Sequence, residues 1–236
     1  MEASPSLLQE HLIGLAGTPD DSSRVGDVLV LIAGLVATRV IAVDYASVTS
    51  RYEGAYATVA ASSEVARSVD EAQYRDDAGP CLEALDAGYP VAVPDIAATM
   101  TWPGFREVAG RFGLWASLSL PLFAGSGQTI AALNLYGRRA GAMRTLTTAV
   151  WGAYDPDAGD SWDHEDLDPG ARELTTGLIG ALARRGTIQQ AIGVIMATTG
   201  RTADRAYLTL RMRAAEFGAS LPDTAARLIE QQVGGA

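Results

Sequence analysis

Apolar residues recur at two different spacings along the first 140 residues, which predicts a mixture of helices and strands. Steps of three and four residues predict helices over residues 7–16, 25–40, 65–78, 80–88 and 102–113. Runs rich in β-branched and aromatic residues predict strands over residues 41–51, 55–63, 89–96, 114–123 and 129–139. Short turns join two pairs of these strands, so the order favours an antiparallel α+β sheet flanked by helices over a parallel βαβ array.

Residues 143–170 lose this periodicity and contain the breaker-rich stretch DPDAGDSWDHEDLDPG, which predicts an acidic loop or linker. Helical periodicity resumes at Ala171, where a connecting helix begins. Its apolar stripe either covers the sheet or pairs with the same stripe of another subunit, and it consists of Leu174, Leu178, Ile179 and Leu182. The chain therefore divides into residues 1–142, 143–170 and 171–236.

The last part of the chain is predicted to form three short amphipathic helices around one small core. The first ends at Gly200 and buries Ile188, Ala191, Ile192 and Ile195. The second follows the N-cap Thr202, leaves Leu208 and Met212 outward, and buries Ala203, Ala206, Tyr207, Leu210, Ala214 and Phe217. The third starts with a pair resembling a capping box, Ser220 and Asp223, and buries Leu221, Ala225, Leu228 and Ile229.

Charge differs between the two ends of the chain. The 236 residues carry a formal net charge of −10, and all 18 basic residues are arginine. Residues 171–236 hold eight arginines and five acidic residues, a net charge of +3, which leaves −13 for the remainder. A weakly basic end on an acidic body indicates two modules with different partners. The absence of lysine excludes Schiff-base and P-loop chemistry.

Residues that usually carry catalysis or bind metals are sparse. Cys81 is the sole cysteine, which predicts no internal disulfide and a reducing, cytoplasmic setting. His11 and His164 form no metal-ligand spacing and no nucleophile–base set. We expect no catalytic residue, no metal site and no cofactor. We also expect no signal peptide and no membrane span, because the longest apolar run is too short and too polar.

The C-terminal part resembles the ANTAR domain, a three-helix RNA-binding unit of bacterial antitermination regulators. The resemblance lies in R-x-x-I-x-Q-A-x-G-V-x-M from Arg185 to Met196, in TADRAYxxLR over 202–211, and in DTA over 223–225. It implies binding to paired RNA hairpins, and the residues it assigns to RNA are Arg185, Gln190, Thr202, Arg205, Arg211 and Arg213. The chain departs from the family at three positions. Family members often have a basic residue where this chain has Ile192, and they tend to have asparagine and lysine where it has Gly218 and Ser220.

The upstream part resembles the GAF sensor domain that accompanies ANTAR in actinobacterial proteins. The matching segments are GPCLEALDAGYPVAVPDI, WPGFREVAGRFG, SLSLPL and AALNLYGRR, within residues 79–139. The resemblance implies a GAF-like antiparallel sheet and an unknown small-molecule ligand. Candidate lining residues of that pocket are Tyr45, Tyr56, Cys81, Asp95, Trp102 and Asn134. For Cys81 a small thiol buried at a helix start is the favoured interpretation.

Gly193 interrupts the first C-terminal helix, where alanine would be more stable by about 1 kcal/mol. We interpret it as a point of close approach by another backbone, from a packed helix or from RNA. The arginines would contact RNA phosphates or stack on unpaired loop bases, because proteins read RNA sequence mostly in single-stranded loops.

The combined interpretation is a cytoplasmic, homodimeric GAF–ANTAR regulator that binds tandem RNA hairpins and has no enzymatic activity. Binding energy that favours the antiterminator hairpin would shift the RNA population towards it. One alternative is a signal-responsive dimerisation or protein-interaction module without RNA binding, which the outward Leu208 and Met212 favour. A GAF-fold enzyme is the other alternative, and the absent lysine, single cysteine and isolated histidines argue against it.

Overall fold

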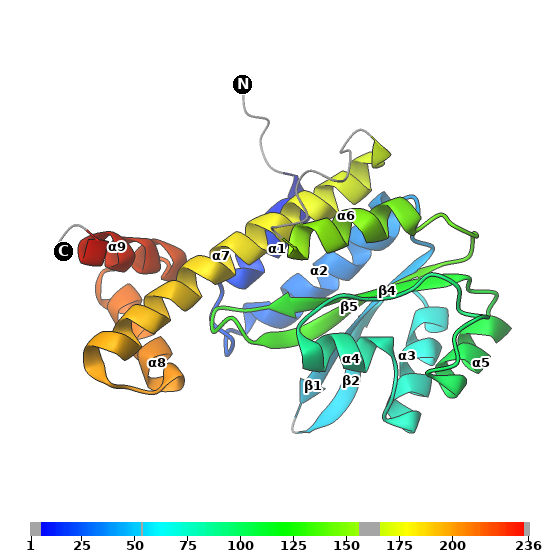
Figure 1. Cartoon of the computed structure of the whole chain (residues 1–236), viewed down its shortest axis with the longest axis horizontal. Coiled ribbons are helices and arrows are strands. Elements are labelled where there is room, and N and C mark those ends of the chain that lie inside the picture. The colour runs from blue at the N-terminus through cyan, green and yellow to red at the C-terminus, as the bar shows by residue number, and fades with distance from the viewer. Residues whose placement is uncertain (1–5, 53, 156–165, 234–236) are drawn as a thin grey trace.

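A five-stranded antiparallel sheet organises the N-terminal part of the chain (Figure 1). The computed structural model describes residues 6–52, 54–155 and 166–233. The strand order is β2-β1-β5-β4-β3. The strands are β1 (Tyr45–Tyr52), β2 (Ala55–Ala61), β3 (Val91–Val93), β4 (Ala116–Phe123) and β5 (Thr129–Gly137). The predicted α+β class with an antiparallel, helix-flanked sheet is confirmed.

One face of the sheet is aliphatic. Alternate positions of β4 and β5 place Leu118, Leu120, Leu133 and Leu135 on this face, and all four are fully buried. The helices that contribute to this core are α1 (Leu7–Ala16), α2 (Arg24–Arg39), α6 (Arg144–Tyr154) and α7 (Pro169–Thr199). Burial of this many aliphatic side chains makes this layer the main hydrophobic core.

The opposite face of the sheet is polar, yet it is equally buried. Its strand positions alternate with the aliphatic ones and are Ser47, Thr49, Ser117, Ser119, Asn134 and Tyr136. This face is covered by α3 (Glu64–Asp76), α4 (Pro80–Ala87) and α5 (Pro103–Arg111). The pleat of the sheet therefore separates an apolar core on one side from a buried polar layer on the other.

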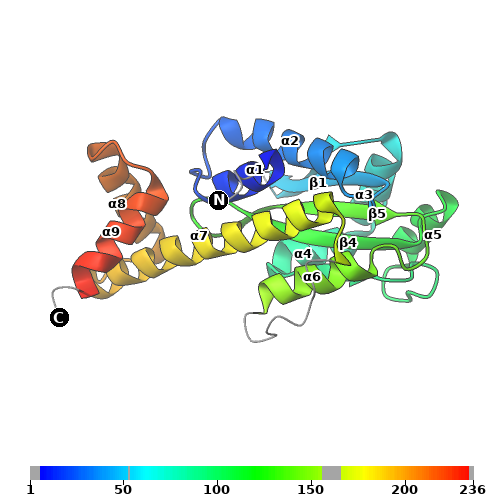
Figure 2. The ribbon, with the colours of Figure 1, turned by 90° about the horizontal axis from the view of Figure 1, so that it is seen from above.

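A single helix of 31 residues, α7, connects the sheet domain (residues 6–155) to the C-terminal end (Figure 2). Its first half packs against α1, where Gly177 lets the Leu12 side chain approach closely. Leu174 and Leu178 are buried there, whereas Ile179 is 39% exposed. The sequence predicts that the connecting helix and the first C-terminal helix are separate helices. This prediction is wrong, because they form one continuous helix with an unbroken hydrogen-bond ladder.

The end of α7 joins two shorter helices, α8 (Ala203–Glu216) and α9 (Leu221–Val233). We call residues 184–233 the knob. Its core consists mainly of Ile188, Ala191, Ile192, Ile195, Ala206, Leu210, Leu221, Ala225 and Leu228. The Ser220 hydroxyl accepts from the Asp223 amide at 3.2 Å, which confirms the cap of the last helix. The sequence predicts that Ala203 and Phe217 are buried in the core of the knob. Both are exposed, so these two predictions are wrong.

The predicted acidic linker is partly wrong. Residues 144–154 of that stretch form α6, whose Leu146, Ala149 and Val150 enter the aliphatic core. Residues 156–165 lie outside the described residues. The charged and breaker residues lie mostly after Tyr154, so the linker prediction overlooked an apolar periodicity at its start.

Candidate functional site

The knob touches the sheet domain at two loops and at the end of α1. Pro222 and Leu221 pack beside Gly17 and Gly125, and the remaining contacts are polar. Arg211, on α8, reaches the loop between α1 and α2, where its Nη2 donates to both carboxylate oxygens of Asp21, at 2.9 and 3.0 Å. The neighbouring Asp20 accepts from the Ser126 amide at 2.8 Å and from the Tyr207 hydroxyl at 3.4 Å. Burial and the nearby Asp20 carboxylate raise the pKa of Tyr207 to about 12. These contacts join α8 to both loops.

Arg185, on α7, makes the second group of contacts. Its Nε donates to the Gly127 carbonyl at 2.7 Å, and its guanidinium lies 4.0 Å from the centroid of the Phe123 ring. A guanidinium over an aromatic face is attracted by the negative face of the ring. Gln189, one turn further on, donates to the Ser126 carbonyl. The hairpin between β4 and β5 is thus held directly by α7.

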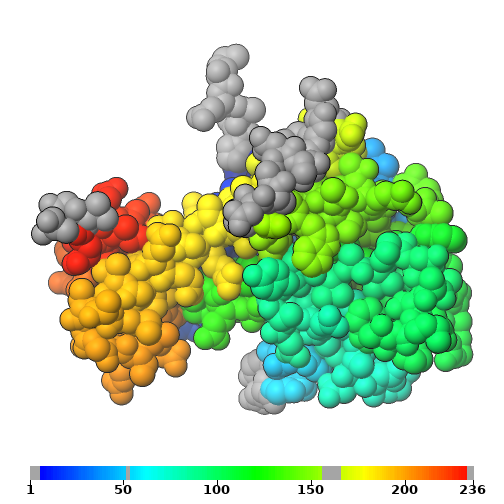
Figure 3. All heavy atoms as spheres, viewed as in Figure 1, coloured from blue at the N-terminus to red at the C-terminus, as the bar shows by residue number. Residues whose placement is uncertain are grey.

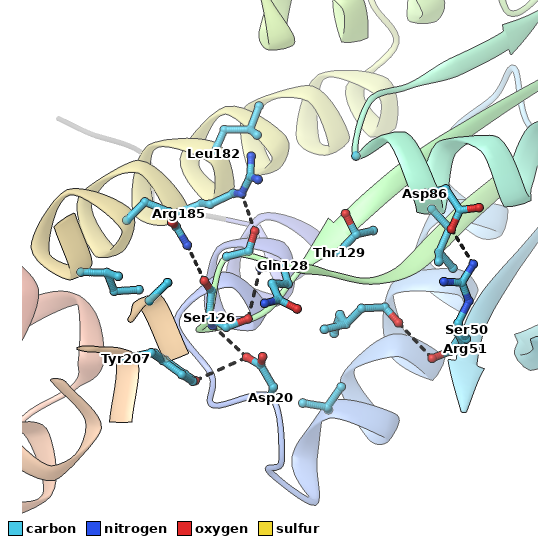
Figure 4. Close-up of a pocket in the computed structure, with 18 of the residues that line it drawn as sticks. Asp20, Ser50, Arg51, Asp86, Ser126, Gln128, Thr129, Leu182, Arg185 and Tyr207 are labelled. Atoms are coloured by element: carbon cyan, nitrogen blue, oxygen red, sulfur yellow. Dashed lines mark hydrogen bonds and ion pairs between the residues drawn. The ribbon is translucent and has the colours of Figure 1, made fainter. Parts of the chain in front are cut away.

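A cleft of about 1040 Å³ opens beside these contacts (Figure 4). In the space-filling view the surface is hollowed between the knob and the sheet domain (Figure 3). The walls of the cleft come from the sheet domain and from α7 and α8, and they include Asp20, Arg51, Asp86, Arg185 and Tyr207. Arg51 is already paired with Asp86 and with Tyr56, so the charges on that wall are largely satisfied.

The seven arginines of the knob differ in their partners. Arg184 donates to the Ile13 carbonyl of α1 at 3.1 Å, so the sheet domain holds it, and Arg201 donates to the Thr209 hydroxyl of α8 at 2.7 Å. Arg185 and Arg211, which the resemblance assigns to RNA, are held by the sheet domain, and this conformation does not present them free to solvent. The side chains of Arg205, Arg213 and Arg227 are exposed and have no partner among the residues that the structure describes. Arg227 is absent from the sequence-based assignment. Its position on the polar side of α9 was the available signal.

The remaining predicted RNA residues and Gly193 face solvent. Gln190 and Thr202 are exposed, and Thr202 occupies the N-cap of α8 without a side-chain capping bond. Apart from its chain neighbours and the backbone of α7 itself, no described atom lies within 4 Å of the position that a Cβ on Gly193 would take. The interpretation of Gly193 as a contact with a packed helix of this chain is therefore wrong. Its approach to RNA stays a prediction.

The six residues predicted for the small-molecule pocket do not line one cavity. Tyr45 packs under Arg138, and Tyr56 stacks on Tyr74. Asp95 accepts from the Ala98 amide, and Trp102 meets the ring of Phe105 edge-on. The two others, Cys81 and Asn134, are fully buried and belong to one hydrogen-bonded region beneath the polar face of the sheet.

Asp70, which the sequence analysis overlooked, is the centre of that region. This fully buried carboxylate of α3 accepts from the Tyr136 hydroxyl at 2.7 Å, from Thr58 at 2.9 Å and from the Asn134 amide at 3.2 Å. Burial raises the pKa of Asp70 to about 6, because these hydrogen bonds only partly offset the cost of removing a charge from water. The polar alternation of the strands was the signal that could have located it.

Cys81 lies next to this network at the start of α4. The Gln73 side chain accepts from the Cys81 amide at 2.9 Å and donates to the Tyr136 hydroxyl at 3.4 Å. Burial raises the pKa of the Cys81 thiol, so it stays protonated and unreactive. A buried thiol at a helix start is confirmed. Two buried polar atoms nearby, Asn134 Oδ1 and Ser117 Oγ, have no hydrogen-bond partner among the described residues.

The raised pKa of Asp70 predicts a dependence of stability on pH. A carboxyl that binds its proton more tightly when folded stabilises the fold at low pH and loses this effect as pH rises through about 6. The free energy of unfolding of the wild type, relative to Asp70→Asn, should therefore rise by about 1 kcal/mol between pH 7 and pH 5. Urea unfolding at both pH values measures it. Parallel pH profiles for the two proteins would contradict the assignment.

The fold and these contacts define a two-module protein, in which an α+β sheet domain holds a basic three-helix knob through hydrogen bonds, an ion pair and apolar packing. The described residues contain no cluster of three or more His, Cys, Asp or Glu able to hold a metal. None of the helices within the described ranges is long and apolar enough to cross a membrane.

Comparison with known proteins gives the family. Residues 25–150 match the GAF domain and residues 177–229 match the ANTAR domain. Because the first match spans more than half of the chain, the protein belongs to the GAF domain family, in the GAF–ANTAR arrangement. ANTAR is an RNA-binding domain and GAF is a sensor domain, so the chain joins a sensor module to an RNA-binding module.

Among solved structures, the chain resembles a domain of a protein described as a two-component sensor histidine kinase from Sinorhizobium meliloti 1021. The two sequences are 15% identical, the alignment covers 70% of this chain and 94% of that chain, and the TM-score is 0.42. No curated protein matches the chain.

Proposed function

We propose that this protein is a cytoplasmic RNA-binding regulator of transcription antitermination, in which the sheet domain controls the knob. The knob binds paired RNA hairpins, stabilises the antiterminator fold and needs no bond chemistry. The observation that carries the proposal is the division of the knob arginines. Arg205, Arg213 and Arg227 are available to RNA, whereas Arg185 and Arg211 are held by the sheet domain.

The electrostatics of the knob support RNA as the partner. Residues 171–236 carry a net charge of +3 within a chain of net charge −10. Three guanidiniums on two neighbouring helices, without a partner among the described residues, form a local positive surface that can neutralise phosphates. The acidic body would repel nucleic acid, so contact is expected to concentrate on the knob.

Control by the sheet domain follows from Arg185 and Arg211, two of the arginines that it holds. While Arg211 pairs with Asp21 and Arg185 lies on Phe123, these cations contribute little to RNA affinity. A signal that favours the undocked arrangement would release both and strengthen RNA binding, as a shift between two populations.

Weakening the docking contact should strengthen RNA binding. We expect Asp21→Asn to raise the affinity of the full chain for a two-hairpin RNA by up to about 5-fold, because an exposed ion pair contributes up to about 1 kcal/mol. The affinity of both proteins should fall as salt rises, more steeply for the variant, since it adds a phosphate contact. Fluorescence anisotropy at two salt concentrations measures both effects.

The matched control is Glu71→Gln, an exposed acid on α3 whose substitution makes the same change in net charge. If Glu71→Gln strengthens binding as much as Asp21→Asn, net charge is the cause and docking is not. RNA affinity that is indifferent to salt, or equal for scrambled loops, would contradict the proposed function itself.

A protein-interaction module is the second candidate. Leu208 and Met212 are 52% and 72% exposed on α8, as expected from the sequence, and exposed apolar side chains of this size are suited to a protein contact.

We propose that the regulator acts as a homodimer, since two linked hairpin contacts gain from effective concentration. Native mass spectrometry of the full chain reports the subunit number and any retained small molecule.

A further inference from the structure

A groove on the knob contains an aromatic side chain that the sequence places in the core. Phe217 is 68% exposed because α8 ends at Glu216 and Phe217 becomes its C-cap. Gly218 follows with φ +59°, a left-handed conformation that turns the chain away from the helix axis. Phe217 keeps a helical hydrogen bond from its amide to the Arg213 carbonyl, at 3.0 Å, so its ring is exposed because it lies at the end of α8, beyond the core of the knob.

The groove has a volume of about 460 Å³ and lies between α8 and α9. Its principal side chains are Arg213, Glu216, Phe217, Arg227, Leu228 and Gln231. None of the residues that line it belongs to the sheet domain. The docking contacts of Arg211 and Tyr207 are made by other positions of α8, so the groove stays open in the docked arrangement.

The side chains of the groove combine three chemical properties. Phe217 offers an exposed aromatic face beside the apolar Leu228. Arg213 and Arg227 are exposed cations without a partner among the described residues. Glu216 adds one exposed carboxylate. This carboxylate repels a phosphate from the groove itself, but it can accept a hydrogen bond from an amino group on the edge of a base.

We propose that this groove holds one unpaired base of an RNA loop. The base stacks on Phe217, its amino edge faces Glu216, and Arg213 and Arg227 contact the flanking phosphates. RNA-binding proteins commonly read splayed loop bases by stacking them on aromatic side chains. The two arginines, which no described residue pairs, favour an RNA over a protein as the occupant. The inference rests on the proposed function and specifies which part of the RNA the knob reads.

The test uses the full chain and a pool of two-hairpin RNAs with randomised loops, from which bound RNA is enriched. For the enriched RNA, Phe217→Ala should weaken binding by about 5- to 150-fold, the range measured for loss of one base–aromatic stack. The loss should be the same at two salt concentrations, because stacking releases no counterion. Arg227→Gln should instead reduce the salt slope by roughly one unit.

Two further variants separate stacking from damage to the knob. Met196→Ala removes an apolar side chain that is 38% exposed elsewhere on the knob and outside the groove, and it should leave RNA affinity unchanged. Phe217→Tyr keeps an aromatic face and should restore most of the binding lost in Phe217→Ala. Circular dichroism should show the same helical content for all variants, since Phe217 is exposed.

The outcomes distinguish the groove from the proposed function. If no RNA is enriched, RNA binding by the knob fails, and the groove proposal with it. If RNA is enriched but Phe217→Ala binds it as tightly as the wild type, the groove proposal alone is overturned. A change in subunit number with unchanged RNA affinity would also overturn it, because the groove would then hold protein.

Discussion

Reversing the charges of Arg205 and Arg213 together should weaken binding of the full chain to a loop-bearing two-hairpin RNA by at least about 100-fold. Both side chains are exposed on α8, and neither has a partner among the described residues. Each substitution to Glu removes an attraction to phosphate and adds a repulsion. Fluorescence anisotropy at two salt concentrations measures the loss, and the remaining binding should depend less on salt.

The control is the double variant Arg75→Glu, Arg144→Glu, which makes the same change in net charge on the sheet domain. Arg75 lies in the last turn of α3 and Arg144 begins α6, and both are exposed. We expect a much smaller loss, because these positions lie away from the knob. Equal losses in the two double variants would mean that overall charge governs binding. Unchanged RNA binding in the knob variant would favour the protein-interaction module.

Gly170→Ala should destabilise the fold by about 3 kcal/mol or more. Gly170 lies in the first turn of α7, where it packs on the end of α2. A Cβ at this position would overlap the carbonyl of Arg39 and lie 2.8 Å from the Val40 amide nitrogen. These are backbone atoms at the end of a helix and cannot move aside as a side chain can. Urea unfolding of the full chain measures the free-energy change.

Gly186→Ala in the same helix is the matched control. Apart from its chain neighbours and the backbone of its own helix, no described atom lies within 4 Å of the position that its Cβ would take. Alanine loses less backbone entropy than glycine in a helix, so this variant should be more stable by about 0.5–1 kcal/mol. Opposite signs for the two substitutions are the expected result. If Gly170→Ala unfolded at the same urea concentration as the wild type, α7 would not start against α2 as the structure shows.

The strands of the sheet could be predicted from the sequence, whereas the buried network on its polar face could not. The five strands and their hairpins follow from local patterns, and the strand predictions agree with β1 to β5 to within a few residues. The buried role of Asp70 does not follow from its own segment. Asp70 lies on a helix of ordinary amphipathic character, and its partners Thr58, Asn134 and Tyr136 come from two strands. Only the sheet brings these groups together.

The knob shows the same limit at single residues. Helical periodicity identified the buried positions of α7 to α9 correctly in most cases, because one face of each helix packs on the others. It failed at Phe217, since a periodicity argument assumes that the helix continues, and the helix ends one residue earlier. It also missed Arg227, which becomes relevant only when α9 lies beside the end of α8.

By itself, the sequence determined the two modules, the class of each, the pattern of strands and helices, and the location of positive charge at the C-terminal end. These features depend on residues close together in the chain, so spacing and composition are sufficient to detect them. Only the tertiary structure decided which arginines are free. Arg211 meets Asp21 across 190 positions, and Arg185 meets Gly127 across 58. Neither partner leaves a local signal, because such pairs exist only after the knob has docked on the sheet domain.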